Sequence, residues 1–388
     1  MSSSPVYLDY AATTPVAPQV AARMAECLTF EGTFGNPGSS SHEYGERARE
    51  RVEAARAQVA AAVGAEPSEV VWTSGATEAN NLAIFGTAHY HRGVGGHIVT
   101  ARTEHRSVLD PCRELERRGW RVTYLKPDRE GLIDPQAVAA AIEPDTVLVS
   151  LMHVNNEIGT LQDIAAIAVS CAAQGRARLH VDAAQSVGKC AVNFAALGVD
   201  LMSLSAHKAY GPKGVGALLV SRRRGARLAP LHLGGGQEGG LRSGTVPTHQ
   251  VVGMGAAFEL ASAALPYEIE RVALLQERLW EGLATLGGVT RNGGARSVPH
   301  LLNVSFDGVE GESLVAAIRP HLAVSTGSAC TSIHREPSSV LRALGRDDRS
   351  AESSLRFSIG RFSTASDVDT ALAVVKHALE RLRRIAGA

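Results

Sequence analysis

The sequence predicts an α/β fold with a mostly parallel central sheet and a second, smaller α+β region. Short apolar runs alternate with helix-period segments through the first two-thirds of the chain. This alternation is typical of parallel strands covered by helices on both faces. Glycine accounts for 39 of the 388 residues and aromatic residues for only 5%. That composition fits an α/β enzyme with many tight turns better than an all-β shell.

The large sheet is expected to contain short strands of three to seven residues, separated by helices and turns. Ligands of such sheets bind beyond the carboxyl ends of the strands, so polar residues at those ends are candidates for chemistry. The expected strands are residues 70–73, 97–100, 122–125, 146–152, 179–181, 201–204 and 215–220, and the expected helices begin at Glu78 or span 108–118, 135–142 and 164–173.

The pattern changes after about residue 260. A long helix is expected from about Tyr267 to Leu286, because apolar residues recur there every three or four positions. A glycine-rich stretch, strands at 301–306 and 355–359, a short helix after Gly311 and a last helix at 366–384 follow. We therefore expect a large ligand-binding domain at 15–260, and a small domain formed by 1–14 and 261–388.

Composition and charge exclude several classes of protein. Lysine plus arginine and aspartate plus glutamate both number 39, so we expect no direct nucleic-acid partner and no membrane partner, since both need excess positive charge. Met1 to Pro5 do not resemble a secretory signal, and the sequence has no long apolar run. The five cysteines are widely spaced and form no CxxC pair. We therefore expect neither a disulfide framework nor a zinc site, and we expect a cytoplasmic protein.

Lys208 and Asp182 each follow an expected strand. Lys208 is either an ordinary turn lysine or a lysine in a partly buried cleft, which can lose its proton and form a Schiff base with an aldehyde. Asp182 is either the N-cap of a following helix or a carboxylate that keeps a pyridine nitrogen protonated. The residues alone leave both alternatives open.

Two further strand ends carry polar residues. Thr73 to Glu78 form a small turn before a helix, whose exposed backbone N–H groups suit a phosphate, although many strand–turn–helix junctions look alike. His105 follows the next strand, as a structural histidine or as one that stacks on a flat ring and moves protons. Together, a phosphate cradle, a stacking histidine, a ring-nitrogen carboxylate and a Schiff-base lysine are the parts of a pyridoxal-phosphate enzyme.

Three features go beyond those parts. Cys330 lies in the small polar run Val324 to Ser332, where it is either a nucleophile or an ordinary thiol. Arg356 stands inside an apolar strand and needs a partner, for which an amino-acid carboxylate is suited. The glycine-rich segment from Gly234 to Thr245 is expected to close over a site or to reach another one.

At this point the sequence resembles the IscS/NifS-type cysteine desulfurases of the class V aminotransferase family. The similarity spans residues 7 to about 362. The matching segments are Tyr7 to Pro15, Gly35-Asn36-Pro37, Thr73 to Glu78, Thr103-Glu104-His105, His153 to Gly159, His180-Val181-Asp182, His207-Lys208, Arg242 to Thr245 and Gly327 to Cys330. The resemblance implies the aspartate aminotransferase-like fold of pyridoxal-phosphate-dependent transferases.

The resemblance also implies roles for individual residues. Lys208 bears the cofactor as a Schiff base, Asp182 pairs with the pyridine nitrogen, and His105 stacks on the ring. The phosphate is implied to be held by Ala76, Thr77, Ser205 and His207, and the phenolic oxygen or the substrate by Gln185 and Asn156.

Further implied roles concern the partners. Thr245 reaches the phosphate of a neighbouring subunit, which implies a homodimer. Arg356 binds the carboxylate of L-cysteine, with help from Asn156. Cys330 accepts the sulfur, and no metal site is expected except transient ligation of an iron–sulfur cluster by Cys330 with a scaffold partner.

The implied activity is the conversion of L-cysteine to L-alanine with a persulfide left on Cys330. That sulfur is expected to pass to an iron–sulfur scaffold or another acceptor, such as the tRNA thiolation pathway. The alternatives are a selenocysteine lyase, another class V enzyme and a non-catalytic scaffold. Two departures stand out: Ala184 replaces a threonine, and the chain ends at Ala388, where housekeeping relatives continue into a tail that helps dock the scaffold.

Overall fold

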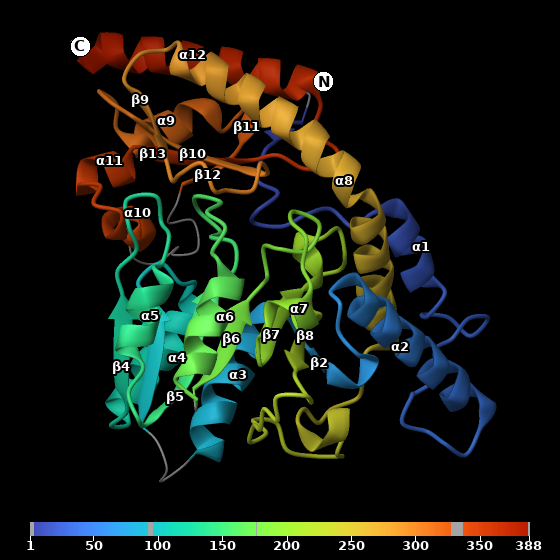
Figure 1. Ribbon diagram of the computed structural model, residues 1–388. Coiled ribbons are helices and arrows are strands. Elements are labelled where there is room, and N and C mark those ends of the chain that lie inside the picture. Colours follow the sequence, from blue (N-terminus) through green and yellow to red (C-terminus); the bar gives the residue numbers. More distant parts are fainter. Residues whose placement is uncertain (1–3, 92–95, 176, 327–336, 387–388) are drawn as a thin grey trace.

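The computed structural model describes residues 4–91, 96–175, 177–326 and 337–386. A seven-stranded sheet forms the centre of the larger part of the molecule (Figure 1). Its order is β2-β8-β7-β6-β5-β3-β4, with all neighbours parallel except β8, which runs antiparallel to β2 and β7. The strands are β2 (Val70–Thr73), β3 (His97–Ala101), β4 (Arg121–Leu125), β5 (Thr146–Met152), β6 (Arg178–Asp182), β7 (Leu201–Ser205) and β8 (Gly216–Val220).

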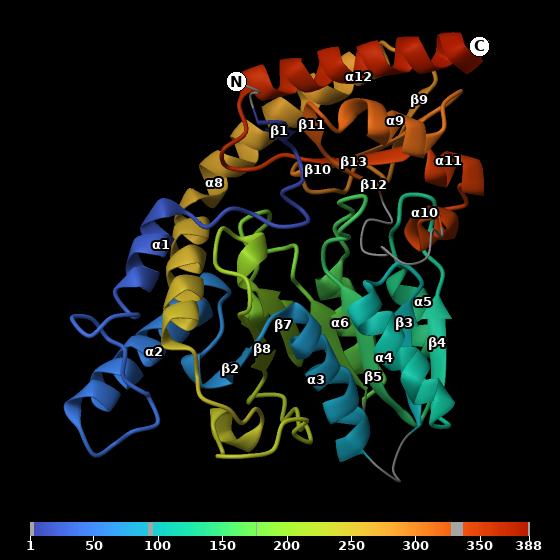
Figure 2. The same cartoon turned by 180° about the vertical axis from the view of Figure 1, so that it is seen from behind.

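Helices cover both faces of this sheet, as the alternating pattern predicts. The helices α3 (Ala76–Tyr90) and α4 (Arg106–Arg117) pack on one face, where Leu82 and Leu115 meet the strand residue Ile98. The other face is covered by α5 (Pro135–Ala141), α6 (Ile164–Ala173) and α7 (Phe194–Leu197), as the two opposite views show (Figures 1 and 2). The predicted mostly parallel α/β fold is confirmed.

A second core lies above the carboxyl ends of the large sheet (Figure 1). Its four-stranded antiparallel sheet has the order β12-β13-β10-β9, and a short parallel pair joins β1 to β11. The helices α9 (Gly311–Ile318) and α12 (Ala365–Ala386) pack on it, and α10 (Ser339–Ala343) and α11 (Asp348–Glu352) lie at one end. The strands are β1 (Val6–Tyr7), β9 (Val289–Asn292), β10 (Leu301–Phe306), β11 (Leu322–Ala323), β12 (Ser325–Thr326) and β13 (Ser354–Ser358).

One long helix, α8 (Thr248–Ala284), runs from the large core to the small one. The predicted start at about Tyr267 is therefore wrong by roughly five turns. Pro266 interrupts the sequence pattern but not the helix, because buried residues such as Val251 and Phe258 extend the packed face before it. The proposed domain boundary at residue 260 falls within this helix and stays a prediction.

Two helices before β2 were not predicted. Helix α1 (Pro18–Ala25) and helix α2 (Glu43–Ala62) pack against the first half of α8 (Figure 2). The buried stripe of α2 consists mainly of alanine with Val52 and Val59, and four arginines and four glutamates cover the rest of the helix. Within the residues described, no helix combines the length and apolar character that crossing a membrane requires.

Candidate active site

Lys208 lies at the carboxyl edge of the large sheet. It ends the short 3-10 helix η2 (Ala206–Lys208), which follows β7 directly. Its Nζ donates hydrogen bonds to the backbone carbonyls of Ala11 and Ala12, at 2.6 and 2.7 Å. The side chain is half-buried and points toward the N-terminal segment, which favours a partly buried cleft over an ordinary surface turn.

Asp182 is the last residue of the neighbouring strand β6, and only 6% of it is exposed. Its Oδ2 accepts a hydrogen bond from Asn80 Nδ2 at 2.8 Å, and its Oδ1 accepts one from the backbone N–H of Ala184 at 3.0 Å. The residues after it form turns rather than a helix. The helix N-cap interpretation of Asp182 is therefore wrong.

The start of α3 lies next to these strand ends. Its N-cap is Gly75, which offers no side-chain cap, so the N–H groups of Ala76 and Thr77 begin the helix without one. Gly216 pairs with Ser205, and a Cβ added to Gly216 would lie 2.7 Å from the Cα of Gly75. A side chain at residue 216 would thus fill the space that this turn occupies.

His105 is the N-cap of α4. Its Nδ1 accepts a hydrogen bond from the backbone N–H of Ser107 at 3.1 Å and lies 2.7 Å from the Ser107 hydroxyl. The same hydroxyl accepts a hydrogen bond from Asn80, at 2.8 Å. A chain of polar contacts therefore runs from His105 through Ser107 and Asn80 to Asp182, and the histidine has a structural function whatever else it does.

Gln185 and His207 both contact the N-terminal segment. Gln185 Nε2 donates to the carbonyl of Ala11 at 2.8 Å, so this oxygen accepts from both Gln185 and Lys208. His207 Nδ1 lies 3.1 Å from the Thr13 hydroxyl, and burial beside lysines lowers the pKa of His207 to about 4. At neutral pH this imidazole is therefore uncharged.

Arg356 comes from the small sheet, in β13, and is 6% exposed. The partner that the sequence left open is Asp9, whose Oδ1 accepts from the guanidinium at 2.8 Å. A second guanidinium nitrogen donates to the backbone carbonyl of Asn156, also at 2.8 Å. Among the residues that the structure describes, Arg356 Nε has no hydrogen-bond partner. The arginine therefore keeps one buried donor for a further acceptor.

Two buried glutamates adjoin this edge of the sheet. Burial raises the pKa of Glu157 to about 7, although Ser338 donates to the carboxylate and Arg356 and His105 lower the pKa. Burial also raises the pKa of Glu104 well above its usual range, and the Asp182 charge adds to that shift. Glu104 accepts a hydrogen bond from the backbone of Met152 at 3.0 Å.

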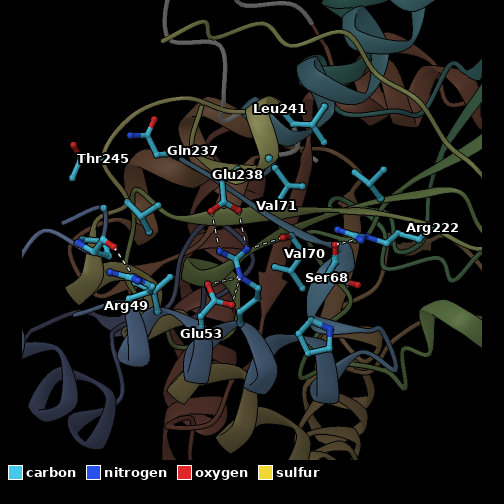
Figure 3. A pocket seen from close by; sticks show the side chains of 18 of the residues that line it. Arg49, Glu53, Ser68, Val70, Val71, Arg222, Gln237, Glu238, Leu241 and Thr245 are labelled. Carbon is cyan, nitrogen blue, oxygen red and sulfur yellow. Dashed lines mark hydrogen bonds and ion pairs between the residues drawn. The ribbon is translucent and has the colours of Figure 1, made fainter. Parts of the chain in front are cut away.

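Two predicted residues stand apart from this cluster. Cys330 falls outside the described residues. Thr245 lines a pocket of about 1110 Å³ that also holds Arg49, Glu53 and Glu238 (Figure 3). None of the residues around Lys208 named above lines that pocket. Within this one chain, the structure therefore does not bring Thr245 to the Lys208 cluster.

Comparison with known proteins identifies the family. The model of the aminotransferase class-V family matches residues 6–371. The chain belongs to this family. It is 55% identical over 380 residues to a cysteine desulfurase IscS of Pectobacterium atrosepticum, which covers 98% of this chain and 94% of the relative. This identity assigns the chain to the IscS-type cysteine desulfurases within the class-V family.

Solved structures agree with this assignment. The chain matches a NifS-like protein with a TM-score of 0.91 and 34% identity, covering 97% of this chain and all of that one. It also matches a protein described as SspA in complex with cysteine, with a TM-score of 0.82 and 38% identity, covering 92% and 99% of the two chains. Class-V membership implies dependence on pyridoxal phosphate, and the fold expected from the resemblance is confirmed.

The structure adds site residues that the sequence analysis did not single out. Asn80 holds Asp182, Asp9 pairs with Arg356, and Ser107 connects Asn80 to His105. Asn80 is an uncharged polar residue on the buried face of α3, with 0% exposure. A polar side chain on a mainly apolar helix face is a signal that was available in the sequence.

Proposed function

We propose that this chain is a pyridoxal-phosphate-dependent cysteine desulfurase, which releases L-alanine from L-cysteine and keeps the sulfur as a persulfide on Cys330. The observation that carries the proposal is the convergence of Lys208, Asp182 and the uncapped start of α3 at adjoining strand ends. These are the amine, the carboxylate and the anion site that the cofactor requires. The IscS-type relatives supply the substrate class.

The residues present fit the phosphate end of pyridoxal phosphate. The backbone N–H groups of Ala76 and Thr77 open α3, and the partial positive charge of a helix N-terminus favours a phosphate. We assign Thr77, Ser205 and His207 to the same phosphate group. The close approach at Gly216 supports this assignment, because it keeps the turn free of side-chain bulk.

The residues also fit the ring end. A buried carboxylate whose oxygens accept from Asn80 and the backbone of Ala184 stays in one orientation, and in its ionised form it can hold a proton on a pyridine nitrogen. With that proton in place, pyridoxal phosphate would supply an electron-withdrawing ring for the substrate carbon that loses its proton. We assign His105 to stack on the ring, and Gln185 and Asn156 to the phenolic oxygen or the substrate.

Lys208 and Arg356 have different roles toward the substrate. Lys208 Nζ would hold the cofactor in the absence of substrate, and would accept the proton from the substrate Cα. Lys208 Nζ donates to the carbonyls of Ala11 and Ala12, which orient the amine at the edge of the sheet. Arg356 binds the substrate carboxylate through the donor that has no partner among the described residues.

Cys330 completes the reaction. Its thiolate attacks the substrate sulfur, the bond between that sulfur and Cβ breaks, and the sulfur remains on Cys330 while the carbon skeleton leaves as alanine after protonation. The persulfide then passes to an iron–sulfur scaffold or another acceptor.

We also propose a homodimer in which Thr245 contacts the phosphate of the other subunit. Its separation from the Lys208 cluster within one chain is consistent with that role.

The test is an absorbance spectrum of the purified protein before and after L-cysteine is added, with alanine and sulfide measured in the same tube. We expect a visible cofactor band that shifts as alanine and sulfide form together. Lys208→Ala should lose the band, and Cys330→Ala should keep the band but lose sulfide release. Alanine from selenocysteine and none from cysteine would instead identify a selenocysteine lyase. A protein that binds no pyridoxal phosphate would contradict the proposal.

A further inference from the structure

Lys189 is a buried lysine that the reaction described above does not use. It lies in the turn that follows β6, seven residues after Asp182, and only 5% of it is exposed. Its Nζ donates to Gln185 Oε1 at 2.9 Å and to the backbone carbonyl of Lys208 at 3.3 Å. Both acceptors belong to residues of the candidate site.

These contacts close a ring of hydrogen bonds. Gln185 accepts from Lys189 at one end of its amide, and at the other end its Nε2 donates to the carbonyl of Ala11. The same carbonyl accepts from Lys208 Nζ, and the backbone of Lys208 accepts from Lys189. Because the carbonyl of Ala11 can only accept, the NH₂ of Gln185 must face Ala11, and the Gln185 carbonyl therefore faces Lys189.

Burial and the nearby positive charges make a protonated lysine at position 189 unfavourable in free energy. Burial is the largest cause that lowers the pKa of Lys189 to about 7, and the positive charges of Lys208 and Arg356 add to it. Cys190 and Glu268 act in the opposite direction, but Glu268 already accepts from Arg361 at 3.0 Å. His300, which is 3% exposed, is a further titratable group on this side, and Lys189 helps to lower its pKa.

If residue 189 only had to fill space, methionine or leucine would be more favourable there than lysine. A buried amine held by neutral carbonyls loses its hydration without gaining an ionic partner from them. That cost is explained if the polar contacts themselves are needed.

We propose that Lys189 is a positioning residue of the desulfurase reaction, which fixes the amide of Gln185 and the backbone of Lys208 relative to each other. It touches neither substrate nor cofactor in this proposal and acts through those two residues. Lys189 also has an electrostatic effect. Its positive charge disfavours a second proton on the Lys208 side of this ring of hydrogen bonds. The expected effect of Lys189 on the reaction rate rests on the proposed function. Its expected effect on the titration of bound pyridoxal phosphate does not.

Two variants separate the hydrogen bond from the charge. Lys189→Met keeps the length of the side chain and removes both, whereas Lys189→Gln retains an N–H donor without charge. The matched control is Lys376→Met, because Lys376 is exposed on α12. Each protein is loaded with pyridoxal phosphate, and three quantities are measured: kcat and KM for L-cysteine, the midpoint pH of the visible band without substrate, and the melting temperature.

We expect Lys189→Met to lower kcat about tenfold, the effect of losing one orienting hydrogen bond, while KM changes less than about threefold. The midpoint of the band should move upward by about one pH unit in both Lys189 variants, because a nearby positive charge is gone. Lys189→Gln should recover most of kcat but keep the shifted midpoint. Lys376→Met should match the wild type throughout.

Two results would overturn the proposal. One is an unmoved band midpoint in both variants with a lower melting temperature, which describes a lysine needed only for folding. The other is a wild-type kcat in Lys189→Met. If Lys189→Met does not fold, the midpoint of Lys189→Gln decides. A wild-type protein that binds pyridoxal phosphate but forms no alanine would refute the desulfurase function alone, because the midpoint still tests Lys189.

Discussion

Replacement of Arg356 by methionine gives the sharpest test of substrate binding. Two guanidinium nitrogens already donate to Asp9 and to the carbonyl of Asn156, and Nε lacks a partner among the described residues. A substrate carboxylate therefore gains about one strong hydrogen bond without disturbing the existing two. One such bond to a charged group contributes roughly 1.5–3 kcal/mol, which is about 10- to 150-fold in binding. We expect kcat/KM for L-cysteine to fall by a factor in that range.

The assay compares L-cysteine with its methyl ester, which lacks the carboxylate charge. The wild type should prefer the acid by about the same factor that Arg356→Met loses, and the variant should treat acid and ester alike. The matched control is Arg361→Met. Arg361 also forms a partly buried ion pair, with Glu268 at 3.0 Å, but lies outside the proposed substrate contacts. That control should lower stability and keep the preference for the acid.

The reasoning is refuted if Arg356→Met still prefers the acid over the ester by the wild-type factor. In that case the loss of activity would come from the broken contact with Asp9, and the carboxylate would bind elsewhere. A loss of preference in Arg361→Met would equally show that the assay reports stability rather than recognition.

Three other changes test the site. Asn80→Ala removes one hydrogen bond from the Asp182 carboxylate, so kcat in the alanine assay should fall about tenfold. Gly216→Ala places a Cβ 2.7 Å from the Cα of Gly75 and should weaken pyridoxal phosphate binding at least about tenfold in equilibrium dialysis. Glu157 titrates at about 7 in the folded protein instead of 4.5, so the native state binds the extra proton and loses stability as pH rises from 4.5 to 7. Urea denaturation should show the stability difference, wild type minus Glu157→Gln, falling by about 3 kcal/mol across that window.

Much of the large sheet could be predicted because its strands are continuous apolar runs that end at small or polar residues. The positions of Lys208 and Asp182 after such runs were enough to predict that they share one edge of the sheet, and β6 and β7 are parallel neighbours that both end at that edge. Strand β8, which contains Gly216, runs antiparallel to its neighbours β2 and β7. The sequence pattern does not distinguish this from parallel pairing, because both faces of β8 are covered.

Other elements could not be predicted for identifiable physical reasons. Helix α2 buries alanines between arginines and glutamates, and a stripe of such small side chains gives a weak periodic signal. The first half of α8 is apolar on nearly every side from Val251 to Phe258, because it packs against both α1 and α2, so no face stands out. Its true start became visible only from these tertiary contacts.

The pairing of polar groups was the least predictable part of the site. The contact of Arg356 with Asp9 joins residues 347 positions apart, and that of Asn80 with Asp182 joins residues 102 apart. The sequence indicated that Arg356 needs a partner, because it stands in an apolar strand. It did not indicate that Asp9 is that partner, since nothing local distinguishes one carboxylate from another.

The N-terminal segment explains why these separate observations belong to one site. Asp9 pairs with Arg356 from the small sheet, and two residues later the carbonyl of Ala11 accepts from both Lys208 and Gln185. The backbone N–H of Ala11 in turn donates to Ser358 of β13, two residues beyond Arg356. A shift of Arg356 would therefore move the carbonyl that orients Lys208. In this arrangement, the proposed carboxylate site and the proposed Schiff-base lysine are coupled through three residues of backbone, which is why a change at either should alter the other.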